Sequence, residues 1–298
     1  MEYYITVLTS ITVTLVAILS MYLLMGLTGI FSMGQASFMC VGAYTTGMIA
    51  TRINMPMPLV LILSILVGMM FAFLVGMPVI KLRRDYIALI TLGFGEAIVA
   101  LLNNMNNITG GALGITRIPR KMNLPLGILI LAIIIFLLVN FKHSKFGRHC
   151  IAIKNDEISA AAMGINVARI KLLAFVFAGG ITALSGGMLA YATTYVEPLA
   201  FGTLKSIDWI SIVFVGGVNS LTGSLVSGLI FGLLPEVLRF ADAWRIIIQC
   251  AIVLLVVNFI PNGLFGEFEL DTIIKRLRSK GKKNADKDKK MSGMEDLK

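Results

Sequence analysis

The chain has 298 residues, of which 57% are apolar (the types AVILMFWYC) and 14% are charged. Soluble globular chains average about 45–50% apolar residues even when glycine is included, and about 25% charged residues. The composition therefore excludes a soluble globular domain, a disordered chain and a disulfide scaffold. It indicates that lipid is the solvent for most of this chain.

Membrane spans are predicted wherever an apolar stretch approaches the roughly 20 helical residues that cross a hydrocarbon core about 30 Å thick. In chain order these stretches are Ile5–Met25, Phe31–Ala50, Leu59–Ile80, Ile87–Leu102, Leu126–Phe141, Ile170–Tyr191, Trp209–Val218 leading into Leu225–Leu238, and Ile246–Ile260. A barrel is excluded because stretches such as Leu126–Leu138 are apolar on every face and do not alternate. We predict an all-α integral membrane protein with about eight to ten transmembrane helices, some short or broken, over residues 1–270.

The distribution of positive charge predicts the orientation, since cytoplasmic loops carry an excess of Lys and Arg. One side holds Lys81, Arg83, Arg84, the loop Lys142–Lys171 and the tail, with 19 basic residues against 7 on the other side. We expect this side, and with it the C-terminus, to be cytoplasmic. The tail over residues 271–298 is expected to be disordered and solvated, or in contact with anionic lipid. It lacks aromatic residues, so nucleic acid is not an expected partner.

Two glycine-rich stretches interrupt the apolar pattern, one from Gly26 to Gly47 and one from Gly216 to Gly232. Glycine permits close helix packing, and it also permits broken helices whose ends face protein or a water-filled path. For Gly216–Ser224, which carries hydroxyls and an amide, we favour a broken helix at a pathway, at mid-membrane depth. Close packing without ligand contact stays open for the other glycines.

Glu96 is a carboxylate inside the predicted span Ile87–Leu102. Such a group is costly in lipid unless it is paired, hydrated or protonated. Its neighbours at three and four residues are apolar or glycine, so we expect a partner on another helix or exposure to water. Two roles stay open, a helix–helix hydrogen bond and a place on a pathway.

The loop Lys142–Lys171 contains a short amphipathic stretch between Ala152 and Met163. The pair Asn155 and Asp156 is a candidate N-cap, and Gly164 is a candidate helix stop. A short helix on the cytoplasmic side suits docking into a groove of a soluble partner. The alternative is a surface loop lying on the membrane.

Catalytic and metal-binding patterns are absent from the sequence. It has no GxxxxGK[ST] phosphate loop and no Ser/His/Asp or Cys/His constellation. Its three cysteines and two histidines are too scattered for a metal site. We therefore expect no enzyme activity, metal or cofactor in this chain, and an energy source in another subunit.

Several blocks resemble the permeases of branched-chain amino acid ABC importers, most closely the LivM-type half. They are Gly26–Tyr44 (GLTGIFSMGQASFMCVGAY), Thr91–Glu96 (TLGFGE) with Asn103, Asn104 and Thr109–Gly111, the loop Gly147–Asn166, Lys171–Phe175, and Gly216–Gly223. They follow the family's order and span most of the chain, from Gly26 to Gly263. The resemblance implies a bacterial plasma-membrane importer of leucine, isoleucine and valine. It also implies as partners a LivH-type permease, two cytoplasmic ATPases that bind ATP and magnesium, and an extracytoplasmic binding protein.

The resemblance also implies two sets of site residues. The substrate pathway is expected at Gly34, Gln35, Ser37, Tyr44, Glu96, Gly216, Gly217, Asn219, Thr222 and Gly223. The ATPase coupling loop is expected at Gly147, Arg148, Asn155, Glu157, Ala160, Ala161 and Gly164.

The sequence departs from the family pattern at Val99, where an Arg is common, at Ala112–Leu113, where polar residues are common, and at Ser224, where Pro is usual. Because of these departures, the sequence does not identify the transported solute. The alternatives are a related ABC permease for urea, amides, other amino acids, sugars or nucleosides, and, from another class, an ATPase-independent secondary transporter or channel. A purely structural membrane scaffold is disfavoured by the glycine-broken spans.

Overall fold

A computed structural model describes residues 2–53, 55–82, 84–237, 244–260 and 263–264. Throughout these residues the regular structure is helical, apart from one isolated bridge between Ile115 and Val196. The long helices are α1 (Glu2–Tyr22, extended by the π-helix η1, Leu23–Thr28), α2 (Gln35–Arg52), α3 (Met57–Val79), α4 (Arg84–Asn104), α6 (Leu124–His143), α9 (Val167–Thr193), α10 (Thr203–Gly216), α11 (Leu221–Val237) and α12 (Trp244–Phe259). The short ones are α5 (Asn106–Thr109), η2 (Gly111–Leu113), α7 (Lys145–Asn155), α8 (Glu157–Ala162) and η3 (Pro198–Phe201).

Helix α9 forms the centre of the bundle and packs against α1, α2 and α3. Small residues permit this, because lipid-embedded helices associate mainly by close van der Waals packing. A Cβ built on Gly42 of α2 would lie 2.0 Å from the carbonyl oxygen of Ala183 in α9. The backbones of α2 and α9 therefore touch, and only glycine fits at this crossing.

The outer helices turn apolar side chains outward, as expected for a lipid-facing surface. Within the described residues, six helical segments are long and apolar enough to cross a membrane. They are Tyr3–Thr28, Met57–Val79, Tyr86–Asn104, Leu124–His143, Val167–Thr193 and Pro198–Gly216. Helix α6 is the most exposed of them, and Phe136 on it is 65% exposed.

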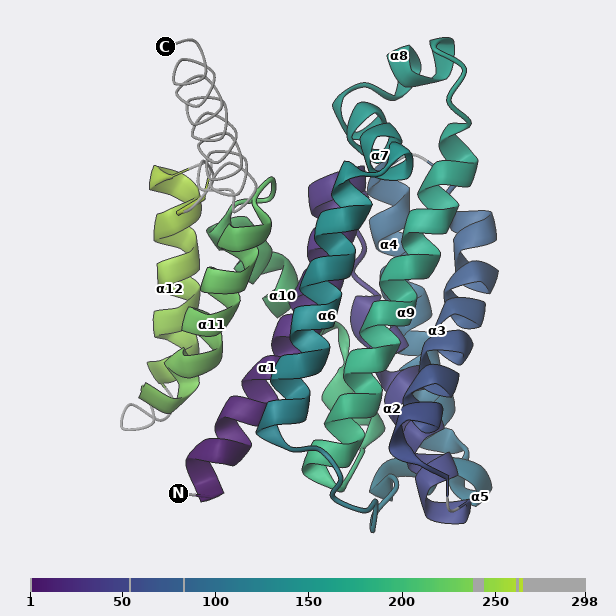
Figure 1. The fold of residues 1–298 in the computed structure, drawn as a ribbon, viewed down its shortest axis with the longest axis vertical. Helices are drawn as coiled ribbons and strands as arrows, with labels where there is room; N and C mark the ends of the chain where they lie inside the picture. Colours follow the sequence, from purple (N-terminus) through teal and green to yellow (C-terminus); the bar gives the residue numbers. More distant parts are fainter. Residues whose placement is uncertain (1, 54, 83, 238–243, 261–262, 265–298) are drawn as a thin grey trace, which may run out of the picture.

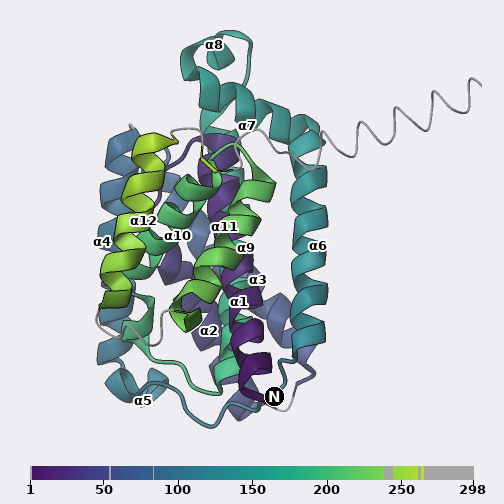
Figure 2. The same ribbon diagram turned by 90° about the vertical axis from the view of Figure 1, so that its left-hand side faces the viewer.

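The two ends of the bundle differ. Figure 1 and Figure 2 show the N-terminus and α5 at one end, and α7 and α8 at the other. The short helices α7 and α8 project beyond the long ones, and α8 is the outermost part of that end. We refer to this as the α8 end.

The prediction of an all-α membrane protein is confirmed, and each predicted span coincides with a helix in the described part of the chain. Two predicted boundaries are wrong. In Phe31–Ala50 the helix begins only at Gln35, because residues 29–34 are not helical. The helix expected to begin at Trp209 already begins at Thr203. The predicted tail, residues 271–298, lies outside the described residues.

Candidate functional site

The first turns of α2 and α10 meet the middle of α4 inside the bundle. The π-helix that extends α1 ends at Gly29, whose φ of 67° is left-handed. The chain then runs without helix to Gly34, with Ile30 and Ser32 buried, before α2 begins. This start of α2 packs against the middle of α4 and the N-terminus of α10. We call this meeting point the helix-end junction.

At the junction the backbone of α2 rests on α4. A Cβ on Gly34 would lie 2.0 Å from the carbonyl oxygen of Thr91, and the amide of Met33 donates to the Thr91 hydroxyl at 3.1 Å. Gln35 is fully buried and its Nε2 donates to the hydroxyl of Thr182 in α9 at 2.7 Å. Polar groups inside a membrane protein are stabilised by such contacts.

Two atoms of this region keep hydrogen-bonding capacity. The Gln35 Oε1 atom is buried and has no hydrogen-bond partner among the described residues, and the same holds for the Ser32 hydroxyl. Ser37, by contrast, is satisfied locally, because its hydroxyl donates to the Gly34 carbonyl at 2.6 Å. The junction therefore holds unused polar atoms at Ser32 and Gln35.

Glu96 of α4 caps the N-terminus of α10. Its Oε1 accepts a hydrogen bond from the Thr203 amide at 2.9 Å, and the Thr203 hydroxyl donates to the same oxygen. A carboxylate at a helix N-terminus satisfies an otherwise unpaired amide and interacts favourably with the helix dipole. One turn further along α10, the Ser206 hydroxyl accepts from the Ala36 amide at 2.9 Å. Of the two roles left open for Glu96, the structure contains the interhelical hydrogen bond, with a side chain that is also exposed.

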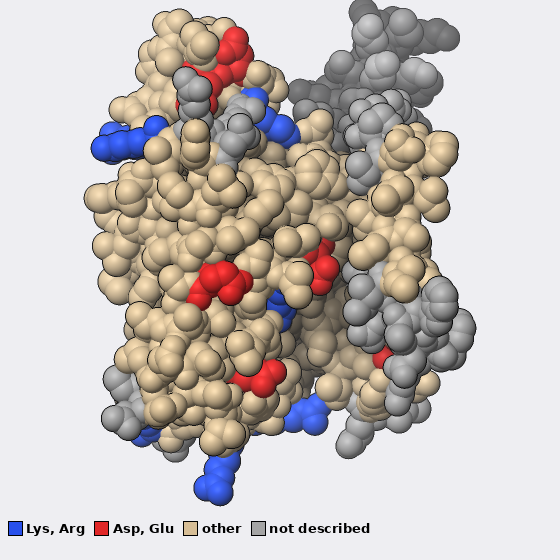
Figure 3. Space-filling view, turned by 180° about the vertical axis from the view of Figure 1, so that it is seen from behind, with Lys and Arg blue, Asp and Glu red and all other residues tan. Residues whose placement is uncertain are grey.

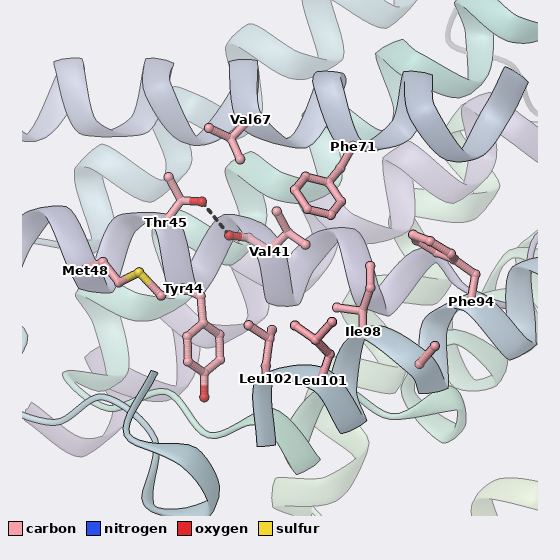
Figure 4. Close-up of a pocket in the computed structure, with 11 residues that line it drawn as sticks. Val41, Tyr44, Thr45, Met48, Val67, Phe71, Phe94, Ile98, Leu101 and Leu102 are labelled. Carbon is pink, nitrogen blue, oxygen red and sulfur yellow. Dashed lines mark hydrogen bonds between the residues drawn. The ribbon is translucent and has the colours of Figure 1, made fainter. Parts of the chain in front are cut away.

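Tyr44 lies further along α2 and lines a cavity of about 350 Å³ between α2, α3 and α4. Figure 4 shows its ring directed away from Val67 and Phe71, on the opposite wall of the cavity. The other lining side chains are almost all hydrocarbon, and the Thr45 hydroxyl donates to the Val41 carbonyl at 2.7 Å. This cavity offers little to a charged solute.

The run Gly216–Ser224 forms the break between α10 and α11, as predicted, but the expected mid-membrane depth is wrong. The break lies at the α8 end, where the Asn219 Oδ1 accepts from the Lys154 Nζ of α7 at 2.5 Å. Lys154 also donates to the carbonyl of Gly26 at 2.6 Å. The prediction failed because the hydropathy pattern did not reveal that α10 begins at Thr203, six residues earlier.

Local geometry explains the residues of this break. Gly217 has a φ of 103°, which an L side chain rarely adopts. A Cβ on Gly216 would lie 2.4 Å from the Gly223 carbonyl, so α10 and α11 touch here. The Ser220 hydroxyl accepts from the Gly223 amide at 3.0 Å, next to Thr222 in the first turn of α11. The predicted pathway residues thus form two groups, one at the junction (Gly34, Gln35, Ser37 and Glu96) and one at the α8 end (Gly216, Gly217, Asn219, Thr222 and Gly223). Tyr44 belongs to neither group and lines the cavity between α2, α3 and α4.

The predicted coupling loop folds as two short helices. Ser144 caps α7, accepting from the Gly147 amide at 3.1 Å, and Gly147 packs directly on the end of α6. Asp156 separates the helices and caps α8, accepting from the amides of Ile158 and Ser159 at 2.9 and 3.1 Å. Hydrogen bonds from the Ser159 hydroxyl and these two amides hold the pKa of Asp156 below its ordinary value. Gly164, with a φ of 82°, follows the last turn of α8, as the helix-stop prediction required.

Contacts hold α8 on α9 while its tip faces outward. The Lys171 Nζ lies 2.6 Å from the Glu157 carboxylate, and the Lys171 side chain is only 3% exposed. Ala160 is buried, whereas Ile158 and Met163 are 83% and 84% exposed. Arg148, Asn155 and Ala161 are also exposed, and Arg148 donates to the His143 carbonyl at 2.8 Å. The outer face of α8 thus carries bare apolar side chains, which we call the α8 tip.

Sequence reasoning missed a third region, a cavity of about 450 Å³ between α1, α10 and α11. Its charged lining residues are Lys205, Asp208 and Glu236, and hydroxyls line its α1 wall at every fourth residue, Thr6, Ser10 and Thr14. That spacing in the first span was the available signal, since residues four apart share a helix face. Among the described residues, no cluster of three His, Cys, Asp or Glu side chains could hold a metal ion.

Comparison with known proteins gives consistent relatives. The family model for the permease component of the branched-chain amino acid transport system matches residues 3–257. The high-affinity branched-chain amino acid permease LivM of Salmonella typhimurium is 26% identical over 280 residues, covering 83% of this chain and 66% of that protein. LivH of Escherichia coli K12 is 28% identical, covering 48% of this chain and 46% of its own. The ribose import permease RbsC of Haemophilus influenzae is 26% identical, covering 74% of each.

The chain thus spans 66% of the length of the LivM relatives it matches. No solved structure matches it.

Proposed function

Because the chain belongs to the family of permease components of branched-chain amino acid transport systems, we propose that it is the LivM-type membrane subunit of an ABC importer. The importer would move leucine, isoleucine or valine into the cytoplasm, driven by ATP hydrolysis in separate subunits. The partners would be a LivH-type permease, two cytoplasmic ATPases that bind ATP and magnesium, and an extracytoplasmic binding protein. The α8 end, with its excess of Lys and Arg, would face the cytoplasm.

The α8 tip is the observation that carries this proposal. Ile158 and Met163 are more exposed than most large apolar side chains of the lipid-facing helices, although α8 projects beyond the bundle. Exposed apolar side chains on a rigid base mark an interaction surface. A short helix that presents them fits a groove on a soluble partner. In the proposed complex this partner is the ATPase.

The contacts of α7 and α8 with the bundle suggest how a conformational change of the ATPase would be transmitted to the pathway residues. Glu157 links α8 to α9 through Lys171, and Lys154 links α7 to η1 and to the α10–α11 break. The far end of α10 is held by Glu96 and by the start of α2. A displacement of α7 and α8 would therefore move α10 against α2 and α4, as a rigid element moves in a hinge transition.

A sugar importer is the second candidate, because a ribose permease matches 74% of the chain. The discriminating experiment reconstitutes the chain with candidate permease, ATPase and binding-protein subunits from the same organism in proteoliposomes. ATP hydrolysis and solute uptake are measured with leucine, isoleucine, valine and ribose, against a complex whose ATPase carries an inactivated phosphate loop. We expect stimulation by the branched-chain amino acids alone. Stimulation by ribose alone would favour the second candidate, and uptake with the inactivated ATPase would refute the importer.

A further inference from the structure

We propose that the cavity between α1, α10 and α11 is a transient binding site for a zwitterionic amino acid with an apolar side chain. The inference rests on the proposed function and deepens it, by naming the groups that would recognise the solute inside the membrane. The volume of about 450 Å³ lies within the range of about 300–1,000 Å³ typical of small-molecule sites. Figure 3 shows acidic and basic side chains at mid-height on one face of the molecule, in addition to the charged side chains at its two ends.

The cavity presents a cation and an anion one helical turn apart. Lys205 and Asp208 both lie on α10 and both line the cavity, as residues three apart on one helix face do. They lie in a segment apolar enough to cross a membrane, where charged side chains are rare and mark solute pathways. The Lys205 ammonium also lies 4.7 Å from the centre of the Phe201 ring, a cation–π contact that orients the side chain. A carboxylate beside Lys205 and an ammonium beside Asp208 would match this pair.

The α1 wall adds oxygen acceptors. The Ser10 hydroxyl donates to the Thr6 carbonyl at 3.1 Å, and the Thr14 hydroxyl donates to the Ser10 carbonyl at 3.0 Å. With their protons directed to the backbone, these hydroxyls present oxygen lone pairs to the cavity. Glu236 of α11 lies on the same lining and accepts from the Tyr3 hydroxyl at 2.8 Å. These oxygen acceptors and the carboxylates of Asp208 and Glu236 suit an ammonium group.

The remaining walls are apolar and buried. Ile11, Trp209 and Phe231 line the cavity and are each at most 5% exposed. They suit a branched hydrocarbon side chain, which gains from leaving water. The cavities of about 350 and 250 Å³ have walls of almost pure hydrocarbon, so they would not compensate the desolvation of two charges. The combination of charge pair, hydroxyls and apolar wall assigns the solute to the larger cavity.

The test uses the complete complex in nanodiscs and measures how fast a thiol reagent modifies Ser10→Cys. Cys40 and Cys150 are fully buried, so only the exposed Cys250 needs replacement, by alanine. L-leucine should slow the modification. Isocaproate, which lacks the amino group, and isoamylamine, which lacks the carboxylate, should each need at least about tenfold higher concentration, since each loses a charge-assisted contact. The matched control is Thr51→Cys, at the exposed end of α2, which leucine should not protect.

Substitutions at the charge pair give a second readout. Lys205→Met should raise the leucine concentration for half-protection about tenfold or more, and Lys205→Arg should restore protection. The double variant Lys205→Met with Asp208→Asn keeps the cavity's net charge and should behave like the single variant. The double variant distinguishes a ligand site from a purely structural ion pair. If the pair were only structural, leucine would protect Ser10→Cys in the double variant as well as it does with Lys205 and Asp208 intact. If the variants fail to assemble, the two analogues still test the site with Lys205 intact.

The proposal is overturned if leucine does not slow the modification, if isocaproate or isoamylamine protects as well as leucine, or if the double variant keeps full protection. Its failure is distinct from failure of the proposed function. Leucine-driven ATP hydrolysis without protection would refute the cavity site alone. If leucine slows the modification but does not stimulate ATP hydrolysis by the complex, the result would support the cavity site and refute the importer assignment.

Discussion

Lys154 joins the short helices α7 and α8 to the bundle of long helices, and replacing it should uncouple the two. Its ammonium donates to the Gly26 carbonyl at 2.6 Å and to the Asn219 side chain at 2.5 Å. In Lys154→Met both hydrogen bonds are lost. The methionine keeps a stem of similar length, so the packing of position 154 beside Gly29 is retained.

The expected size of the effect follows from these two contacts. A hydrogen bond from a charged group contributes about 1.5–3 kcal/mol when shielded, and much less when exposed. The hydrogen bond to Gly26 is partly buried and the hydrogen bond to Asn219 is exposed. We therefore take about 2 kcal/mol as the contribution of the two hydrogen bonds together. That is roughly a 30-fold change in the equilibrium between the linked and unlinked arrangements of α7.

The assay is the number of leucine molecules imported per ATP hydrolysed in proteoliposomes. In Lys154→Met this ratio should fall at least about tenfold while basal ATP hydrolysis and assembly persist. Lys145→Met is the matched control, since Lys145 is an exposed residue in the first turn of the same helix. An unchanged ratio in Lys154→Met, or an equal loss in Lys145→Met, would refute the link.

Three further predictions concern the fold. Glu96→Ala should destabilise the permease by about 1 kcal/mol through loss of the α10 cap, seen as a lower thermal unfolding temperature of the detergent-solubilised protein; an unchanged temperature would contradict the cap. Gly42→Leu should cost about 3 kcal/mol or prevent assembly, whereas Gly93→Leu, where a Cβ would meet no atom within 4 Å, should leave the unfolding temperature unchanged. Because the folded pKa of Asp156 is lowered, its contribution to α8 is present above the ordinary carboxyl pKa and is lost as pH falls through the lowered value. A fluorophore on Met163→Cys should report this acid transition, and Asp156→Asn, which still caps, should remove it.

Hydropathy predicted the spans well where lipid alone determines the sequence. Leu126–Phe141 became α6, Leu124–His143, because a lipid-facing helix must be apolar on nearly every face. The start of α10 was missed because Lys205 and Asp208 lower the hydropathy of its first turns. These residues face a cavity, which is a tertiary property that no local pattern reveals.

The candidate site was predictable only in part for a similar reason. Glu96 and its partner Thr203 are 107 residues apart in the sequence, so the pairing depends on the fold. The stretch before Gln35 reads as helix because Ile30, Phe31 and Met33 are apolar. It is not helical, and its backbone packs instead on Thr91 of α4. By contrast, the Asp156 cap and the Gly164 stop are local features, and the sequence predicted both.

In the proposed importer, the α8 tip docks on a cytoplasmic ATPase. The most direct measurement is co-purification of the candidate ATPase subunit with the permease carrying Ile158→Glu and Met163→Glu, against a control with Lys145→Met. We expect the double substitution to abolish co-purification and leucine-driven ATP hydrolysis, while the control retains both, because two charges would have to be buried in the partner's groove. Undiminished ATPase binding by the doubly substituted permease would contradict the claim.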